Sequence, residues 1–461
     1  MNIRKKIAVF FVLFMLACGV SAGEVKNVIW IIGDGMGPEL MGFFMQGVKH
    51  ASIKTYPDKT SNMEKMMNKG QWGLFFNNTY DTVVTDSAAA GTQMAIGKYS
   101  RPEYIGVDYN GEPSQTILEL AKEKGKSVGI VSDAYVTDAT PAAFVAHVSS
   151  RGHKTEIARQ MIDLEPDVIL GGGLKYFNSG DNKNLLKKAR MKGYQTVFNK
   201  EELAKIKKGK LLGLFSEQGM PVAIEMYQYP HLPSLAEQTR KALDLLSQNE
   251  EGFFLMVEAG KIDWTAHSNE EGATFHEMLV LDAALKEALD FAEKNPDTLI
   301  YLNADHDTGM GGFTYRYLNG EQASRKTSQG EVLYGYNVDY ASLKEYDKMV
   351  GQKRYLYNLV SELKKMPSSQ LNTEYIEKRF SEALGYPVDI SSYKNPLDLD
   401  GLVKQMTIDR GFAWATGTHT SAPVLSVAYG PAAEKFTGIY HNTDIFGRLV
   451  EAYGWTEETG K

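Results

Sequence analysis

Acidic and histidine side chains follow directly after several short apolar runs of the chain. The runs and the residues that follow them are 28–32 with Asp34, 253–257 with Glu258 and Asp263, and 299–302 with Asp305 and His306. Asp34 lies between two glycines, which on its own is typical of a turn. In open α/β sheets, however, ligands bind beyond the carboxyl ends of the strands. Several carboxylates and an imidazole at one such edge therefore predict metal ligands.

Asp263 and His267 are spaced i, i+4, so in a helix both side chains lie on one face and can share a cation. On spacing alone, an exposed Asp–His pair is the simpler interpretation. The adjacent Asp305–His306 pair favours a metal site, because imidazole nitrogen and carboxylate oxygen together suit zinc. His419, within the sequence Gly-Thr-His-Thr, would complete such a site.

Ser87 precedes a run of small residues, so we expect it at the start of a helix. A simple N-cap explains a serine at such a place. Free backbone N–H groups and the helix dipole there also favour an anion. The nearby sequence contains no histidine that could act as a base, so activation of the Ser87 hydroxyl by a metal ion is the favoured interpretation.

The elements that must position these residues alternate along the chain. Apolar runs without polar alternation favour parallel strands covered on both faces. They lie at 28–32, 128–131, 168–170, 253–257, 299–302 and 424–428. Helical periodicity appears at 116–124, 234–247 and 272–294, and Ser234 to Glu237 has the form of a capping box. The pattern predicts an α/β fold with a doubly wound, mostly parallel central sheet and helices on both faces.

A tyrosine-rich stretch at 313–410 interrupts this alternation and is expected to be a partly helical insertion. Helices are predicted near 374–384 and 397–409. The tyrosines include Tyr315, Tyr317, Tyr334, Tyr336, Tyr340, Tyr355 and Tyr357. Two interpretations stay open, a solvated decoration and an active-site rim or subunit contact.

The N-terminus has the layout of a signal peptide over residues 1–22, leaving a catalytic domain at 23–461. Basic residues at 4–6 precede an apolar run at 7–17 and small residues at 20–22. We therefore expect export to the periplasm or the outside of the cell. A buried N-terminal strand is one alternative. Another is a lipid anchor on Cys18, the single cysteine, because residues 15–18 form an imperfect lipobox.

The overall charge excludes a general nucleic-acid surface. The 461 residues carry a formal net charge of -7, whereas such surfaces need clustered positive charge. A phosphate-binding site in this chain must therefore be positive only locally, and metal ions are the obvious source of that charge.

Six motifs, in order, resemble those of the alkaline phosphatase family. They are Gly33 to Gly37, Thr85 to Ala89, Asp138 through Thr140 to Arg151, Glu258 through Asp263 to His267, Ala304 to His306, and Thr418 to Thr420. The resemblance spans about residues 27–450 apart from the insertion. It implies hydrolysis of small phosphate monoesters through a phosphoserine on Ser87, with Arg151 binding two phosphate oxygens. The family commonly forms homodimers.

The resemblance also implies two zinc ions and one magnesium ion. One zinc would be held by Asp263, His267 and His419, and a second by Asp34, Asp305 and His306 together with Ser87. Magnesium would take Asp34, Thr140 and Glu258, an all-oxygen set that suits this ion.

Two positions depart from familiar relatives. Trp264 follows the zinc ligand Asp263 where a lysine or histidine often stands, and Asp138 is expected to orient a water on magnesium. A phosphodiesterase or nucleotide pyrophosphatase with the same two-zinc site is the nearest alternative. A non-catalytic protein that sequesters phosphate or zinc is the alternative from a different class.

Overall fold

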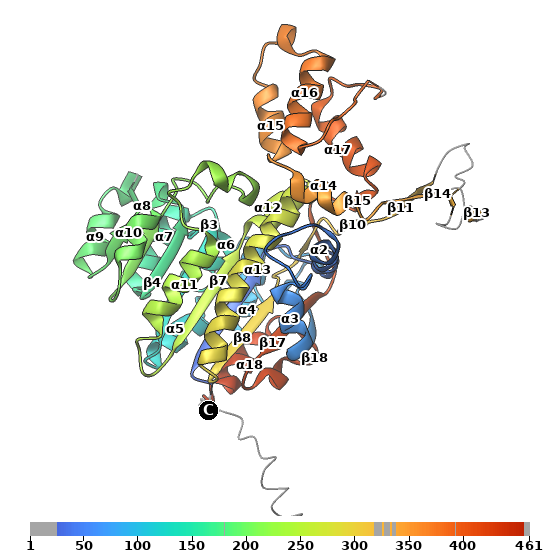
Figure 1. The fold of residues 1–461 in the computed structure, drawn as a ribbon. Helices are drawn as coiled ribbons and strands as arrows, with labels where there is room; N and C mark the ends of the chain where they lie inside the picture. Colours follow the sequence, from blue (N-terminus) through green and yellow to red (C-terminus); the bar gives the residue numbers. More distant parts are fainter. Residues whose placement is uncertain are drawn as a thin grey trace, which may run out of the picture.

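A ten-stranded sheet forms the centre of the computed structural model, which describes residues 25–178, 180–317, 325–326, 332–333, 338–391 and 393–455. From edge to edge the strands are β18 (Gly438–His441), β2 (Gln71–Phe76), β17 (Val424–Tyr429), β8 (Thr298–Asn303), β1 (Asn27–Gly33), β7 (Phe253–Ala259), β3 (Ser127–Tyr135), β4 (Val168–Gly172), β6 (Leu211–Leu214) and β5 (Gln195–Val197). Neighbouring strands are parallel except where β17 pairs with β8 and β2. The predicted mostly parallel α/β sheet is confirmed (Figure 1).

The direction of β17 corrects one expectation. The apolar run at 424–428 predicts a parallel strand, but β17 runs antiparallel to β8, with Val427 opposite Leu302. An apolar run indicates burial on both faces and carries no information about strand direction. The neighbouring β2 was not predicted although Trp72 and Leu74 to Phe76 are apolar, and three of its six residues are exposed in the structure.

Helices alternate with these strands. They are α2 (Pro38–His50), α3 (Asn62–Lys69), α4 (Ser87–Ile96), α5 (Ile117–Glu123), α6 (Ala139–Ala142), α7 (Lys154–Leu164), α8 (Lys175–Asn178), α9 (Leu185–Met191), α10 (Lys200–Lys205), α11 (Leu235–Leu246), α12 (Lys261–His267), α13 (Glu271–Lys294) and α18 (Asp444–Ala452). Short 3₁₀ helices are η1 (Gly180–Asn182), η2 (Ala223–Gln228) and η4 (Ala433–Phe436). The predicted helical ranges coincide with α5, α11 and α13, and the capping box of Ser234 and Glu237 is present at the start of α11.

The sheet is covered on both faces. α11 and α13 pack against each other and lie in front of the sheet in Figure 1. Every residue of β7 is buried, as expected for a central strand between two helical layers. Trp30 on β1 is fully buried, packs edge-on against Phe144 and donates its indole N–H to Asn303 Oδ1 at 2.6 Å.

The tyrosine-rich stretch leaves and re-enters the core between two paired strands, β10 (Gly311–Phe313) and β15 (Phe412–Trp414). Between them lie β11 (Tyr315–Tyr317), β12 (Arg325–Lys326), β13 (Val332–Leu333), β14 (Val338–Tyr340), α14 (Glu345–Gly351), α15 (Leu356–Leu363), η3 (Ser368–Gln370), α16 (Thr373–Leu384) and α17 (Leu399–Asp409). The two predicted helices correspond to α16 and α17. Tyr334 and Tyr336 lie outside the described residues.

Helices α15, α16 and α17 form a small body of their own, which lies apart from the central sheet in Figure 1. Its apolar cluster includes Leu359 of α15, Phe380 of α16 and Leu402 of α17, all buried. This cluster is separate from the main core, so the body has its own hydrophobic centre.

The predicted signal peptide, with Cys18, lies outside the described residues. Among the residues that the structure describes, no helix has both the length and the apolar character needed to cross a bilayer.

Candidate active site

Three carboxylates lie at the carboxyl ends of three adjacent strands. The order β8, β1, β7 brings Asp305, Asp34 and Glu258 to one edge of the sheet. The three residues are 0%, 6% and 1% exposed. Gly35 follows Asp34 with φ +71, and a Cβ there would lie 2.7 Å from Thr308 Oγ1 and 2.9 Å from Asp263 Oδ1. The glycine therefore allows the turn after β1 to approach the other site residues.

Asp263, His267 and His419 form the first group of metal-binding character. The predicted i, i+4 pair lies on α12, where Asp263 Oδ2 is 3.3 Å from His267 Nε2. His419 comes from β16 (His419–Thr420), which pairs with β9 (Asp307–Thr308). Its Nε2 lies 3.5 Å from Asp263 Oδ1 and 3.1 Å from His267 Nε2.

The second group surrounds His306, which is fully buried. His306 Nε2 lies 3.1 Å from Asp305 Oδ2 and 3.5 Å from Asp34 Oδ1. Donor atoms of Asp34, Asp263 and His306 also lie within 4.8 Å of one another. Asp263 thus stands between the two groups, and the rings of His306 and His419 stack with centroids 3.6 Å apart.

Each of these histidines points Nε2 into the site, because its Nδ1 faces an acceptor. His267 Nδ1 lies 2.8 Å from the carbonyl of Gly417, and His419 Nδ1 lies 2.9 Å from that of Thr85. A carbonyl only accepts, so each Nδ1 carries the proton and each neutral ring has its lone pair on Nε2.

His306 is held in the same way by Thr308 of β9. The Thr308 hydroxyl donates to Asp263 Oδ1 at 2.6 Å, so at 3.2 Å it accepts from His306 Nδ1.

Oxygen atoms form a third group on the other side of Asp34. Asp34 Oδ2 lies 3.4 Å from the Thr140 hydroxyl, while its Oδ1 faces His306. Glu258 accepts a short hydrogen bond from the Ser132 hydroxyl. One carboxylate, Asp34, therefore faces two groups, nitrogen-containing on one side and all-oxygen on the other.

The donor set fits bound cations. Asp34 Oδ1 and Asp305 Oδ2 are buried and accept no hydrogen bond within the described residues. The lone pairs of His267 Nε2 and His419 Nε2 face each other at 3.1 Å, and two nitrogens on one tetrahedral zinc lie roughly 3.3 Å apart. Buried charges are costly unless they are paired or coordinate metals.

The pKa values of several site residues are shifted because carboxylates are buried close together. Burial, followed by the charges of Asp305 and Asp263, raises the pKa of Asp34 well above its ordinary value. Burial also raises the pKa of Glu258 well above its ordinary value. Burial acts in the same direction on Asp263, but in the metal-free protein the hydrogen bonds of protonated His267 and His419 and the charge of His306 together outweigh it and lower the pKa of that carboxyl. The hydrogen bond to Asp263 raises the pKa of His267 to about 8.

Ser87 is the first residue of α4, as the run of small residues predicts. The N-cap is Asp86, whose carboxylate accepts from the N–H of Ala89 at 3.0 Å. Ser87 is therefore not required for capping, and its buried Oγ lies 3.1 Å from His306 Nε2. The hydroxyl is placed at a helix N-terminus and beside the second group.

Arg151 lies between two carboxylates. Its guanidinium is 3.4 Å from Asp86 Oδ2 and 3.5 Å from Asp138 Oδ1, and Lys154 Nζ lies 2.8 Å from the same oxygen of Asp138. About 28% of the Arg151 side chain is exposed, so the guanidinium can still reach a ligand. Asp86 links this arginine directly to the segment that carries Ser87.

Comparison with known proteins identifies the family. Residues 25–454 match the family model described as alkaline phosphatase. The chain belongs to the alkaline phosphatase family. Members of the alkaline phosphatase family are phosphoric monoester hydrolases, and the protein is an enzyme of this class. The family is metal-dependent, in agreement with the two groups of ligating side chains.

Individual alkaline phosphatases are similar over nearly their full length. Alkaline phosphatase 4 of Bacillus subtilis is 33% identical over 469 residues, which cover 96% of this chain and 95% of the relative. The crystal structure of Thermus thermophilus alkaline phosphatase superposes with a TM-score of 0.79 at 27% identity, covering 94% of this chain and 92% of that one. The structure of a cold-active alkaline phosphatase from a psychrophilic Shewanella species gives 0.76 at 29% identity, covering 93% and 99%.

Several residues of this alkaline phosphatase site were not found by sequence reasoning. They are Asp86 and Lys154 around Arg151, Ser132 at Glu258, and Thr308 between Asp263 and His306. Asp86 lies next to Ser87 and Thr308 lies two residues after His306, so adjacency was the only signal available. Trp264 turns its ring toward Tyr135, with centroids 5.7 Å apart, and Asp138 caps α6.

Proposed function

We propose that the protein hydrolyses phosphate monoesters through a covalent phosphoserine on Ser87, at a site that holds two zinc ions and one magnesium ion. The observation that carries the proposal is the position of the Ser87 hydroxyl. It lies at a helix N-terminus and 3.1 Å from His306 Nε2, and the neighbouring Asp86 contacts Arg151. Nucleophile, anion-binding amides and guanidinium are thus gathered in one place.

The donor chemistry supports the assignment of the metals. Mixed nitrogen and oxygen donors suit zinc, so Asp263, His267 and His419 would hold one ion, and Asp34, Asp305 and His306 the other. Thr140, Glu258 and the second oxygen of Asp34 are all-oxygen donors and suit magnesium. When bound, these ions supply positive charge that favours the serine alkoxide and stabilises the leaving oxygen.

The residues of the chain then have defined tasks. The Ser87 hydroxyl gives its proton to water and Oγ attacks phosphorus; the bond from phosphorus to the ester oxygen breaks, and that oxygen takes a proton from water and leaves as the alcohol. Arg151 and the free N–H groups of α4 bind the non-bridging oxygens during this step. A water oxygen then displaces Ser87 Oγ and releases inorganic phosphate. Asp86 and Asp138 hold the guanidinium of Arg151 in place while both steps proceed.

The same residues disfavour the alternatives. A diester carries a second substituent where Arg151 and the Thr140 and Glu258 group would meet the phosphate, so a phosphodiesterase is less well supported. A protein that only sequesters phosphate or zinc needs no hydroxyl at the position of Ser87. Turnover of a chromogenic monoester by the metal-loaded protein separates an enzyme from a binding protein.

The decisive variant is Ser87→Ala. We expect it to keep its metals and its fold, because Ser87 contributes one hydroxyl contact, and to lose turnover by roughly a thousandfold or more. Acid-quenched wild-type enzyme should yield a phosphopeptide that contains Ser87. A phosphopeptide that maps to another residue would show that the nucleophile is assigned wrongly.

We also propose that residues 1–22 direct export to the periplasm or beyond and that residues 23–461 form the mature catalytic domain with its insertion at 313–410. The basic, apolar and small-residue order of the first 22 residues supports this. N-terminal sequencing of the exported protein tests it. Incorporation of a labelled fatty acid that is lost in Cys18→Ser would indicate the lipid-anchored form instead, and sedimentation equilibrium tests for a homodimer.

A further inference from the structure

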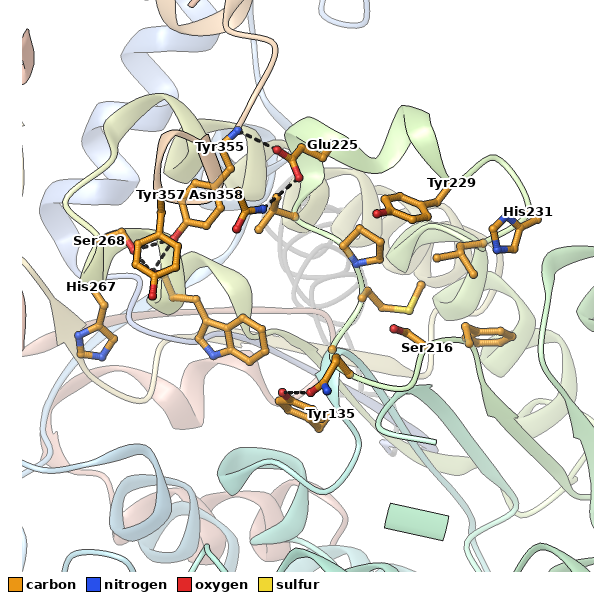
Figure 2. Close-up of a pocket in the computed structure, with 18 residues that line it drawn as sticks. Tyr135, Ser216, Glu225, Tyr229, His231, His267, Ser268, Tyr355, Tyr357 and Asn358 are labelled. Atoms are coloured by element: carbon orange, nitrogen blue, oxygen red, sulfur yellow. Dashed lines mark hydrogen bonds between the residues drawn. The ribbon is translucent and has the colours of Figure 1, made fainter. Parts of the chain in front are cut away.

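A cleft of about 1110 Å³ opens beside the first group of ligands. It is larger than the roughly 300–1,000 Å³ of ordinary ligand pockets. His267 lies at one end, and Tyr229 and His231 lie at the opposite end (Figure 2). Both the core and the insertion contribute to its lining, the latter through Tyr355 and Tyr357. The cleft therefore extends from the candidate catalytic centre into a space that the insertion helps to enclose.

Aromatic side chains make up much of the lining. Near α12, the rings of Tyr135 and Trp264 lie 5.7 Å apart, and from the insertion the rings of Tyr355 and Tyr357 also lie 5.7 Å apart. Gly219 lies directly beneath the indole, since a Cβ there would come within 2.8 Å of Trp264 Cη2. Flat apolar faces with polar tips suit a ligand that carries a flat ring.

Glu225, the one carboxylate among the residues that line the cleft, is already paired. Glu225 is 9% exposed, accepts from Asn358 Nδ2 at 3.1 Å and from the N–H of Tyr355 at 3.3 Å, and lies 3.7 Å from Arg354 Nε. The Tyr355 hydroxyl is likewise engaged, 2.6 Å from Ser268 Oγ.

The ammonium groups of Lys154 and Lys175 lie 5.2 and 5.3 Å from the centre of the Tyr135 ring, and they donate to Asp138 and Gln218. These charges are thus already engaged within the protein, and the lining offers stacking faces and hydrogen-bonding tips to a neutral ligand.

Buried polar groups hold the wall of the cleft in position. Lys261 is 1% exposed and donates a short hydrogen bond to the carbonyl of Pro221, and the Glu277 carboxylate accepts from the N–H of Ala223 at 2.7 Å. The insertion side is held by Glu270, which accepts from the N–H groups of Leu356 and Tyr357 at 2.7 and 3.1 Å. Because these contacts are made within the protein itself, the cleft is formed before a ligand enters.

The alcohol that leaves the phosphorus is expected to lie on the side of this cleft. Ser87 lies beside His306, and in-line displacement places the departing oxygen on the side of phosphorus opposite the attacking oxygen. The group formed by Asp263, His267 and His419 lies next to His306, because the His419 ring stacks on the His306 ring, and His267 is the member of this group that lines the cleft. The cleft begins at His267, so the alcohol part of the substrate has this space beyond its oxygen.

We propose that the cleft binds the alcohol part of the substrate and selects phosphate monoesters whose alcohol is neutral and carries a flat ring system. This selectivity rests on the proposed phosphomonoesterase function and adds a substrate class to it. Tyr357 is more exposed than Tyr229, at 60% against 38%, and it lies outside the ligand groups.

Substrate pairs that differ only in the ring test the proposal. With the zinc- and magnesium-loaded enzyme, kcat/KM is measured for ribose 5-phosphate against adenosine 5′-monophosphate, and for ethyl phosphate against 2-naphthylmethyl phosphate. Because each pair shares a primary alcohol, the chemical step is matched. We expect the ring-bearing member to react about tenfold faster or more, as stacking on aromatic side chains permits. A preference in the first pair alone would restrict the class to nucleosides.

Tyr357→Ala should reduce this preference severalfold and leave the ring-free substrates unchanged. Tyr227→Ala is the matched control, because Tyr227 is 68% exposed on η2 but does not line the cleft. Equal kcat/KM within each pair for the wild type, or an equal loss on both members in Tyr357→Ala, would overturn the proposal.

Failure of the proposed phosphomonoesterase function can be told apart from failure of the cleft proposal. If no monoester is hydrolysed, the phosphomonoesterase function falls, and binding of 2-naphthylmethanol is then followed by saturation-transfer NMR. Binding that is weakened in Tyr357→Ala and kept in Tyr227→Ala would support the cleft as a ring-binding site. Equal or absent binding in all three proteins would refute it.

Discussion

At the scale of single residues, the protonation of the ligand histidines is set from outside the ligand groups. The acceptors that hold each Nδ1 proton are the carbonyl of Gly417, the carbonyl of Thr85 and the hydroxyl of Thr308. Partners of this kind fix the orientation of a ligand ring and its basicity. Thr308 is the one side chain among the three, so it is the one that mutation can remove.

We predict that Thr308→Val weakens zinc binding by about 10- to 100-fold with little change in fold, because Asp263 and His306 both lose their hydroxyl partner. Zinc content after equilibration with a graded chelator measures the effect. Thr420→Val is the matched control, since Thr420 lies in the two-stranded ribbon formed by β9 and β16, as Thr308 does, and its hydroxyl donates to Asp307 at 2.6 Å. Equal zinc retention in both variants would contradict a positioning role.

Arg151 supports a prediction about selectivity. Charge-assisted hydrogen bonds contribute about 1.5–3 kcal/mol, so Arg151→Ala should lower monoester kcat/KM by roughly ten- to a few-hundredfold and diester hydrolysis much less. A monoester dianion offers the guanidinium more free oxygens than a diester does. The ratio of the two kcat/KM values is measured at equal metal content. Arg151→Lys tests whether charge alone suffices, and a constant ratio in the alanine variant would favour the phosphodiesterase alternative.

The sequence allowed the ligand candidates to be selected but not the contacts between them. Asp34, Glu258 and Asp305 were predicted because each follows an apolar run, and the strand order does place them at one edge. The contact of Arg151 with Asp86 joins residues 65 positions apart, and only the fold brings them together. Ser132 directly follows the apolar run at 128–131, the same signal that selected the carboxylates, whereas Thr308 carried no signal beyond its neighbours.

At the scale of elements, α12 and α13 connect the catalytic centre with the insertion. α12 carries two of the ligand candidates, and Glu270 and Glu271 follow within four residues of His267. Glu270 accepts from the first N–H groups of α15, and Glu271 pairs with Arg410 after α17, where both side chains are buried. Breaking a buried ion pair by removing one partner is strongly destabilising. The helical body of α15 to α17 is therefore fixed at the start of its first helix and just after its last helix by the start of α13.

Glu270 supports a prediction of pH dependence. Burial raises its pKa to about 8 although N–H groups of Leu356 and Tyr357 lower it. The unfolded chain releases this proton near pH 4.5, so between about pH 4.5 and 8 the folded protein binds more protons. Its contribution to the free energy of unfolding is therefore full at low pH and falls as the pH rises through this window.

We expect Glu270→Gln to lower the protection of α15 amides against hydrogen exchange and to flatten the fall in stability between pH 5 and 8. Glu374→Gln, at an exposed position on α16, is the control. An unchanged slope in Glu270→Gln would mean that other groups produce the pH dependence.

Elements with a strong apolar or helical period were predictable, and those that depend on distant partners were not. The ranges of α5, α11 and α13 follow from periodicity and capping residues that lie within each segment. The direction of β17 depends on how the chain returns from β16, and β2 depends on its pairing with β17. The cleft joins Trp264 with Tyr357, which lie on separate elements with no shared period.

At the scale of the whole molecule, an acidic protein concentrates four buried carboxylates at one edge of its sheet. The net charge is -7, and the buried groups are Asp34, Glu258, Asp263 and Asp305. The overall field opposes the approach of a phosphate dianion, so local positive charge from metals and Arg151 must overcome it. We therefore expect the stability of the fold to depend on the same ions as the proposed chemistry.

We predict that removing the metals makes stability decline as the pH rises. The folded pKa values of Asp34 and Glu258 lie well above their ordinary values when burial is not compensated, so in the apo protein these two groups contribute most to stability in acid and lose that contribution on deprotonation. Metal binding has the opposite dependence, because ligands must be deprotonated. The difference in Tm between metal-loaded and chelator-treated protein should therefore widen from pH 5 to 9.

A ligand, here the metal ion, at a concentration about 1,000 times its Kd adds about 4 kcal/mol to the free energy of unfolding. A change of this size is easily measured by calorimetry. A gap that stays constant with pH would show that the buried carboxylates are not the source of the metal-linked stability.

The pairing of β10 with β15 has a consequence for how such enzymes diversify. Phe313 lies opposite Phe412, so the chain leaves the core and returns to it at adjacent points of one short ribbon. Nearly a hundred residues between these points can lengthen, shorten or be exchanged without moving the ends that the core requires, since the entropy of closing a loop grows only slowly with its length. Changes within this one segment can therefore alter the substrate range while the metal-binding edge of the sheet stays the same, provided that the contacts of Glu270 and Glu271 with the segment are kept.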